Sequence, residues 1–411
     1  CVVGSGLLGL PYGLAESGWI GVGILIGIAV VGVYTASILV QCLSPPSGRK
    51  LVLYGDIGKE ALGRSGEVAV TVVLHVALLG IATLFLILAG GNLSSLLAGV
   101  PWPTADGYEV TLVDISDQAA IILVAVLMWG HVWLKTMHEV GFTSAFNMLV
   151  ALFLFVVVIV EILVNVPSPR GEHTFINLED SGLSLAGGFV TFSFSFGANA
   201  VIPSVYETMA KPQQFKPMIA VTYTGILAIY LPMAILGYWA YGSDALSPIY
   251  RNICSDDDIC SFWQLLGVWL AVAALTVHVI LAYAVILHPT ERLLEQLLRV
   301  DSLPQPKQKI ASVSLRTAIM VGTVIVACLV PDFTDFMNLV SSVSSTFTSF
   351  VFPCFFHALI FWKDVKKRWW LLVLDVGIIL VALTAGFFGA VFAILSLSCD
   401  LFDYTIIASL P

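Results

Sequence analysis

The chain has 411 residues, of which 58% are hydrophobic and 11% charged, whereas soluble domains carry about 25% charged residues. Its 18 basic and 27 acidic side chains cannot cover the surface of a soluble protein of this length. The composition therefore excludes a soluble fold and makes lipid the surrounding solvent, in which the backbone must satisfy its own hydrogen bonds. The net charge of −9, without a basic cluster, indicates no nucleic-acid partner.

Long apolar runs predict membrane-spanning helices. Segments such as 20–39, 68–88 and 371–395 are continuously apolar and reach the length of about 20 residues that a spanning helix needs. Barrel strands would instead alternate apolar and polar residues. We predict an all-α polytopic membrane protein with eleven transmembrane helices in one domain, 1–411. In chain order the predicted spans are 1–16 (partial), 20–43, 68–98, 118–136, 142–165, 184–208, 217–241, 262–288, 312–330, 335–361 and 370–398.

The basic residues predict an orientation. Cys1 already lies in an apolar stretch, so we expect a start truncated within the first helix. If the amino terminus is cytoplasmic, 16 of the 18 basic residues fall in inner loops, and only Arg170 and Arg251 lie outside. This assignment counts Arg292 and Arg316 with one inner loop, with Arg316 near the inner end of the predicted span 312–330.

Two segments are poor helix formers within otherwise apolar spans. They are 4–11 (GSGLLGLP) and 193–203 (SFSFGANAVIP), and each has a glycine a few residues before a proline. Interruptions of this kind free backbone amides and carbonyls, which persist in a membrane where they line a cavity. Freed amides suit an anionic group and freed carbonyls suit a cation, so a zwitterion could use both.

The two interrupted segments lie within the first and the sixth predicted spans, which are the first spans of the two halves. Corresponding Gly/Pro interruptions in two halves indicate a transporter built from inverted repeats, with its binding site at the breaks. We therefore predict a 5+5 inverted repeat plus one helix, with helices 1 and 6 broken mid-membrane. The first repeat is 1–165, the second is 184–361, and the extra helix is 370–398. The alternative is that these residues only allow close helix packing.

No motif of an enzyme or of a resident cofactor is present. The sequence contains no GxSxG, HExxH, Walker or dinucleotide-binding pattern, so we expect no enzyme, no cofactor and no direct use of ATP. Seven scattered cysteines give no metal-ligand spacing. Cys254 and Cys260 share one predicted outer loop, where they form either a disulfide or two free thiols.

Ionisable groups inside spans are candidates for ion coupling. His75 and His278 lie deepest, and a histidine can exchange a proton near neutral pH. Each could instead be a neutral histidine packed between helices. Thr276 lies two residues before His278 and supplies a hydroxyl.

An ordered series of motifs resembles the amino acid/auxin permease family and covers nearly the whole chain. The motifs are GSGLLGLPYGLAESGW, YGDIGKEALG, FLILAGGNL, FSFSFGANAVIPSVYETMAKPQQF, YLPMAILGYWAYG, HVILAYAVILHPTERLLE and PDFTDFMNLVSSVSSTFTSFVFPCFFH. The resemblance implies a fold like that of the bacterial leucine transporter, with eleven helices. It also implies substrate contacts at Gly4, Ser5, Gly6, Leu7, Phe196, Gly197, Ala198 and Asn199. Asn199 stands where relatives often show histidine or glutamine. His278 falls where several members have a histidine, and Thr276 where sodium-coupled members tend to show a threonine.

The resulting expectation is a secondary active transporter of amino acids or related small zwitterions, proton-coupled and working by alternating access. Sodium coupling is one alternative, an amino-acid sensor on the same scaffold is another, and an ion channel is a third. We expect a functional monomer in the lipid bilayer of the plasma membrane or of a vacuolar or lysosomal membrane. The sequence does not name the amino acid.

Overall fold

The structure is a computed structural model, and it describes residues 5–101, 109–110, 112–132, 140–166, 168–177, 182–253, 261–330 and 332–408. Within these residues, nine helical segments are long and apolar enough to cross a membrane, judged by length and composition. They are Ile20–Cys42, Arg64–Ala98, Phe146–Val164, Leu183–Thr208, Pro212–Asp244, Phe262–Leu297, Lys307–Leu329, Phe333–Ile360 and Trp369–Ser398. A shorter apolar helix covers Asp117–Gly130. The prediction of an all-α polytopic membrane protein is confirmed.

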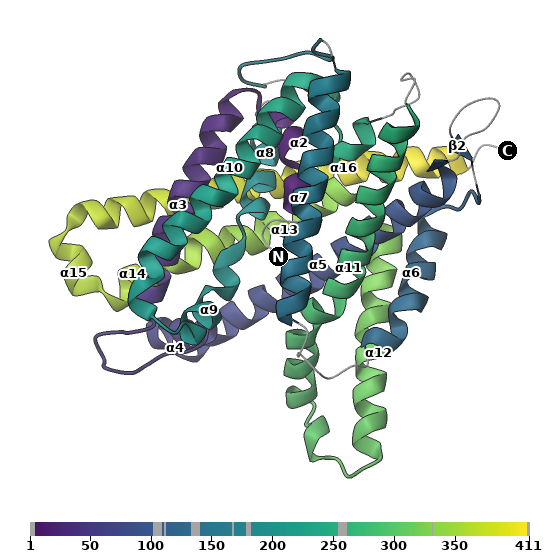
Figure 1. The fold of residues 1–411 in the computed structure, drawn as a ribbon. Helices are drawn as coiled ribbons and strands as arrows, with labels where there is room; N and C mark the ends of the chain where they lie inside the picture. The colour runs from purple at the N-terminus through teal and green to yellow at the C-terminus, as the bar shows by residue number, and fades with distance from the viewer. Residues whose placement is uncertain are drawn as a thin grey trace. The chain divides into compact units, whose positions relative to one another are not determined.

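The elements follow one another as short and long helices with one small hairpin (Figure 1). The α-helices are α1 (Ser5–Leu8), α2 (Leu10–Ser17), α3 (Ile20–Cys42), α4 (Tyr54–Leu62), α5 (Arg64–Ala98), α6 (Asp117–Val132), α7 (Val140–Asn165), α8 (Leu183–Ser195), α9 (Ile202–Thr208), α10 (Phe215–Tyr241), α11 (Phe262–Leu297), α12 (Lys307–Leu329), α13 (Phe333–Ser345), α14 (Phe352–Ile360), α15 (Trp362–Lys367) and α16 (Trp369–Ala408). The 3-10 turns are η1 (Ala198–Val201), η2 (Pro212–Gln214), η3 (Gly242–Asp244), η4 (Ile249–Asn252) and η5 (Val300–Ser302). A π-helical segment, η6 (Thr346–Val351), joins α13 to α14. Strands β1 (Val100–Pro101) and β2 (Glu109–Val110) pair antiparallel, with Val100 opposite Val110.

Contacts divide the chain into two compact units. Unit 1 contains Cys1–Ala77, Ser168–Ile249 and Met337–Pro411, and unit 2 contains Leu78–Pro167 and Tyr250–Phe336. Within unit 1, α8 packs against α2, α3 and α16, α10 packs against α2 and α3, and α14 packs against α3. Within unit 2, α11 packs against α7 and α12 packs against α6. Each unit is thus assembled from segments that are far apart in the sequence.

Glycine, proline and capping residues set the helix ends. Helix α2 follows Gly9 and has Pro11 in its first turn, where the missing proline N–H costs nothing. Helix α10 ends at Gly242, whose φ of 56° suits a residue without a Cβ. At the start of α11, Ser261 N donates to Gln264 Oε1 over 2.7 Å and completes a capping box. These glycine, proline and capping residues explain where the helices begin and end.

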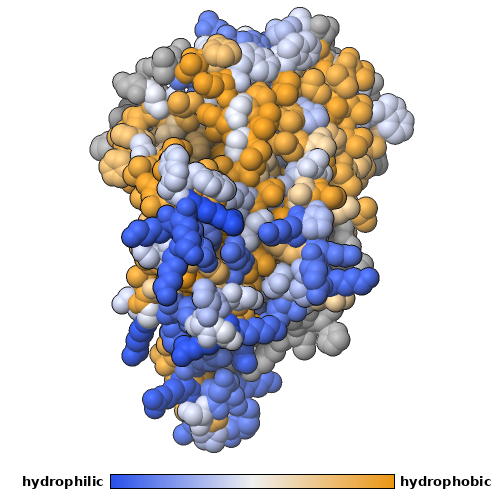
Figure 2. Space-filling model, turned by 90° about the vertical axis from the view of Figure 1, so that its left-hand side faces the viewer, coloured by the Kyte–Doolittle hydropathy of each residue, from blue (hydrophilic) through white to orange (hydrophobic). Residues whose placement is uncertain are grey.

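Large apolar side chains lie on the outside of the helices. Exposed examples are Val72, Leu127, Val221, Trp369 and Phe387. Figure 2 shows broad areas of hydrophobic side chains on one face of the molecule, with hydrophilic side chains gathered lower on that face. Such a surface suits a lipid environment, because contiguous apolar patches of this kind are rare on soluble proteins.

Helix α11 is longer than the predicted span 262–288. It continues to Leu297, so Arg292, which we predicted in an inner loop, is helical. Arg316 lies in α12 (Lys307–Leu329), in agreement with the predicted span 312–330, and its side chain is only 1% exposed. Hydropathy ended the span 262–288 too early because acidic and basic side chains that neutralise one another can be buried together, and a hydropathy profile does not see the pairing.

Candidate functional site

Helix α8 is interrupted within unit 1. It ends at Ser195, and the chain passes through Phe196 and Gly197 into the 3-10 turn η1 before helix α9 begins. The ring of Phe196 is 3% exposed. It stacks on Tyr223, with ring centroids 5.6 Å apart. The aromatic contact fixes the direction in which the chain leaves α8.

The freed carbonyl at the end of α8 is satisfied from α10. Tyr230, which is fully buried, donates its hydroxyl to the carbonyl oxygen of Ser195 over 3.0 Å. Freed backbone groups inside a membrane protein need partners of this kind. The Tyr230 hydroxyl therefore gives the Ser195 carbonyl a hydrogen-bond partner at the point where α8 ends.

The other interrupted segment lies against this one. The short helix α1 ends at Leu8, and Gly9 precedes α2. Ser195 Oγ lies 2.9 Å from the carbonyl oxygen of Gly6. A Cβ added at Gly6 would stand 2.8 Å from the Cα of Ser195, so only glycine allows the two backbones to approach this closely.

Asn199 connects the interruption to two further elements. Its Nδ2 donates to Thr35 Oγ1 on α3 over 2.9 Å and to the carbonyl oxygen of Ser349 in η6 over 3.0 Å. The side chain is fully buried. Its Oδ1 is buried and has no hydrogen-bond partner among the described residues. An unpaired buried acceptor costs free energy, so Oδ1 is available to a donor from outside the protein.

Further polar groups surround the interruption. Thr191 Oγ1 donates to Asn338 Oδ1 over 2.7 Å, and Ser341 Oγ donates to the carbonyl oxygen of Val190 over 2.6 Å. Asn338 Nδ2 and Ser349 Oγ are buried atoms without a hydrogen-bond partner in the described part of the chain. Unit 1 thus contains both donors and acceptors that no protein group uses.

The structure describes six of the eight predicted substrate contacts fully, and these six lie in the two interrupted segments. Gly6 and Leu7 are buried in α1, and Phe196, Gly197, Ala198 and Asn199 form the turn after α8. Ser5 begins α1. Gly4 lies outside the described residues, as do Cys254 and Cys260. That these positions bind substrate stays a prediction.

The predicted ion-coupling residues belong to unit 2. Thr276 and His278 on α11 are 6% and 5% exposed. Thr276 Oγ1 donates to the carbonyl oxygen of Val272 in its own helix over 2.8 Å. His278 Nδ1 is buried and has no hydrogen-bond partner in the described residues. This nitrogen can therefore accept or release a proton without first breaking a protein hydrogen bond.

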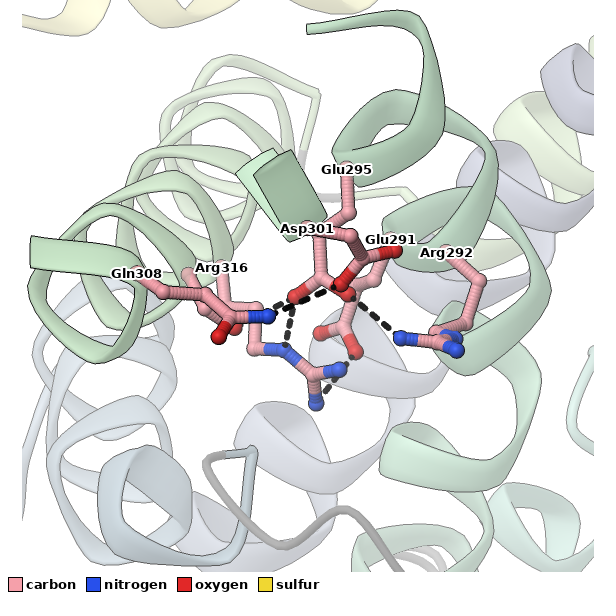
Figure 3. A network of polar contacts seen from close by, with 7 residues as sticks. Glu291, Arg292, Glu295, Asp301, Gln308 and Arg316 are labelled. Carbon is pink, nitrogen blue, oxygen red and sulfur yellow. Dashed lines mark hydrogen bonds and ion pairs between the residues drawn. The ribbon is translucent and has the colours of Figure 1, made fainter. Parts of the chain in front are cut away.

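A charged network of unit 2 lies near the end of α11 (Figure 3). Arg316 Nη1 is 2.9 Å from Glu291 Oε2, and its Nε is 3.0 Å from Glu295 Oε1. Ser312 also donates to Glu295, and Arg292 Nη1 lies 3.1 Å from Glu295 Oε2. Both carboxylates are buried, but two guanidinium groups balance their charges.

Sequence reasoning missed a buried acid and base in unit 1. Asp375 on α16 is fully buried, and His357 on α14 is 4% exposed. His357 Nδ1 lies 2.9 Å from Asp375 Oδ2. A signal was present in the sequence, since Asp375 is an isolated acid within the apolar span Trp369–Ser398.

The fold and the interrupted helices define a multi-pass α-helical membrane protein with unused polar groups in its interior. Residues 1–395 match the family model described as "Transmembrane amino acid transporter protein". The chain belongs to this family, the amino acid/auxin permease family, and the predicted resemblance is confirmed. The family is one of transporters and not of enzymes.

Relatives from Arabidopsis thaliana support the family assignment. The chain is 30% identical over 385 residues to the amino acid transporter AVT1J, covering 92% of this chain and 85% of that relative. It is 27% identical over 401 residues to AVT1I, covering 95% of this chain and 91% of the relative. It is 28% identical over 354 residues to AVT1D, covering 85% of this chain but only 60% of that longer protein.

Proposed function

We propose that this chain is a secondary active transporter of amino acids or related small zwitterions. The observation that carries the proposal is the close approach of the two interrupted segments at Gly6 and Ser195, with the unpaired Oδ1 of Asn199 nearby in the same turn. A zwitterion needs donors for its carboxylate and acceptors for its ammonium group. The amides of the interrupted segments can supply the donors, and freed carbonyls with Asn199 Oδ1 the acceptors. The names of the relatives agree with this substrate class.

The predicted spans that each of the two units contains support the inverted-repeat architecture. Unit 1 combines the first two predicted spans of each repeat with the tenth and eleventh spans, and unit 2 combines the third and fourth of each repeat with the fifth span. The first four spans of the two repeats are thus divided in the same way, as expected for a repeated architecture. We therefore propose eleven spans, repeats 1–165 and 184–361, an extra helix 370–398, and mid-membrane breaks in the first and sixth spans, with a cytoplasmic amino terminus.

We further propose proton coupling with His278 as the proton carrier. Its buried Nδ1, which has no hydrogen-bond partner in the described residues, supports this role. Sodium coupling is the competing hypothesis, and Thr276 would then be the residue to test. The protein would work as a monomer in the plasma membrane or in a vacuolar or lysosomal membrane.

Uptake in proteoliposomes tests the function. The purified protein is reconstituted with a panel of radiolabelled amino acids under an inward proton gradient, under an inward sodium gradient at fixed pH, and with neither. We expect accumulation of at least one amino acid under the proton gradient alone. Accumulation under sodium alone would reject proton coupling, and no accumulation or exchange of any amino acid would reject the transporter.

Counterflow separates a transporter from a sensor. In this assay, unlabelled amino acid inside the vesicles drives the entry of labelled amino acid through exchange. A transporter exchanges the label, whereas a sensor on the same scaffold binds it without exchange. A channel would instead give uptake that does not saturate with substrate concentration.

A further inference from the structure

Asp375 joins three helices of unit 1. Tyr34 on α3 donates its hydroxyl to Asp375 Oδ1 over 2.6 Å, and His357 on α14 holds Oδ2 at 2.9 Å. Asp375 lies six residues after Trp369, the first residue of α16, which places it about 9 Å along the helix at 1.5 Å per residue. The cluster therefore lies within a spanning segment, where ionisable groups are rare and usually functional.

The charge of this cluster depends on one proton. An ionised Asp375 beside a neutral His357 leaves one negative charge, whereas a protonated ring makes the pair neutral. Among the described residues of unit 1, no other Asp, Glu, Lys, Arg or His side chain is buried. No buried cation can therefore replace the proton, and an uncompensated charge at this depth is costly.

We propose that His357 and Asp375 form a proton-binding site. Nδ1 of His357 faces Asp375, so Nε2 takes the second proton of the ring. Tyr34 keeps its own proton and holds the other carboxylate oxygen. The inference rests on the proposed function, because proton-driven transport gives such a site its role, and it adds a site in unit 1 to His278 in unit 2.

The proton-binding site is connected to the interrupted helix by two routes within unit 1. Tyr34 is followed by Thr35, which accepts the hydrogen bond from Asn199. Asn199 also bonds to Ser349 of η6, and η6 leads directly into α14, which carries His357. A π-helical segment such as η6 often marks a functional position. A proton on the pair can thus change the hydrogen bonds that hold Asn199.

Other titratable groups on the packed elements do not compete for this proton near neutral pH. They are Cys42 and Tyr34 on α3, Cys354 on α14, and Tyr54, Asp56, Lys59 and Glu60 on α4, together with the exposed Lys363, Asp364, Lys366 and Lys367 of α15. Thiols and phenols ordinarily titrate above pH 8, and the charges of α15 face water. The imidazole is the group whose ordinary titration range covers pH 5 to 8.

Gradient-driven accumulation tests the site. An inward gradient of one pH unit, coupled to one proton, supports about ten-fold accumulation of a neutral substrate, since one pH unit equals about 1.4 kcal/mol. We expect Asp375→Asn to bring this ratio close to one. The double variant His357→Gln/Asp375→Asn should do the same, because it keeps a neutral, hydrogen-bonded pair that cannot take a proton.

The control is Asp364→Asn, which makes the same chemical change as Asp375→Asn. Asp364 on α15 is exposed, so its charge faces water. This variant should accumulate substrate as the parent does. If the folded double variant also accumulates as the parent does, the pair is a structural contact and the inference is overturned. A parent that neither exchanges nor accumulates amino acids would reject the proposed function instead.

Thermal unfolding of the purified protein tests proton binding without transport. A proton held more tightly in the folded state stabilises the parent below the ordinary titration range of histidine, and this stabilisation is lost as the pH rises. The unfolding temperature of the parent relative to the double variant should therefore fall between pH 5 and pH 8. A difference that does not change with pH would overturn the inference, whatever the uptake assay gives.

Discussion

Two buried networks of this protein use carboxylates in different ways. In unit 2, Glu291 and Glu295 face Arg316, whose guanidinium stays protonated at any physiological pH. In unit 1, Asp375 faces His357, whose imidazole can gain or lose a proton. In the first network the cation keeps its charge, which suits a structural clasp, whereas in the second the cationic partner can itself lose its proton, which suits a proton-binding site. The partner of a buried acid therefore decides what the acid can do.

Removing the fixed charge should have the largest effect. Arg316→Met leaves the buried Glu291 without its ion-pair partner and leaves Glu295 with Arg292 alone, and breaking a buried pair typically destabilises a protein by about 3–5 kcal/mol. We expect a strongly lowered unfolding temperature in detergent, or loss of folded protein on size exclusion. The comparison variant is Arg292→Met, because Arg292 is 44% exposed and Glu295 keeps the buried Arg316 in that variant. Equal effects of the two substitutions would contradict the clasp.

Closing the interrupted segments should abolish substrate binding. Gly6→Val adds a branched side chain at a position where even a Cβ would lie 2.8 Å from the Cα of Ser195, and such overpacking costs about 1–3 kcal/mol. We expect loss of uptake with folded protein still present, measured by counterflow and size exclusion. Gly27→Ala is the control, because nothing lies within 4 Å of a Cβ at Gly27. Normal uptake by Gly6→Val would remove the segment from the binding site.

Asn199 should influence both stability and selectivity. Asn199→Ala removes two hydrogen bonds, each of which typically contributes about 0.5–1.5 kcal/mol to stability. We also expect a changed order of preference across an amino-acid panel, because Oδ1 is the acceptor that the protein leaves free. Thr35→Val removes one partner of Asn199 but keeps Oδ1, so it should lower stability without reordering the panel. An unchanged order in Asn199→Ala would make Asn199 purely structural.

His278 should have the smallest effect on stability. Its Nδ1 has no protein partner in the described residues, so His278→Gln breaks no hydrogen bond at that atom. We expect nearly unchanged unfolding and a lowered accumulation under a proton gradient. Undiminished accumulation would make it a packed core histidine. If a sodium gradient drives the parent at fixed pH, Thr276→Val becomes the informative variant.

The sequence predicted the features that depend on short segments. Apolar runs predicted the helical membrane class, because a bilayer requires helices that satisfy their own backbone. Glycine and proline at 4–11 and 193–203 predicted where the helices stop, because these residues restrict the local backbone wherever they occur. The family motifs could also be recognised from the sequence alone, because each motif is a continuous stretch of the chain.

Only the tertiary structure decided which distant side chains meet. Ser195 reaches the carbonyl of Gly6 across 189 positions of sequence, and Tyr34 reaches Asp375 across 341. Hydropathy gave no sign that Arg316 is buried, whereas the structure pairs it with two glutamates of α11. The free energy of a charge or an amide depends on its partner and on its distance from water. Those are properties of the packed helices, and no single segment of the sequence contains them.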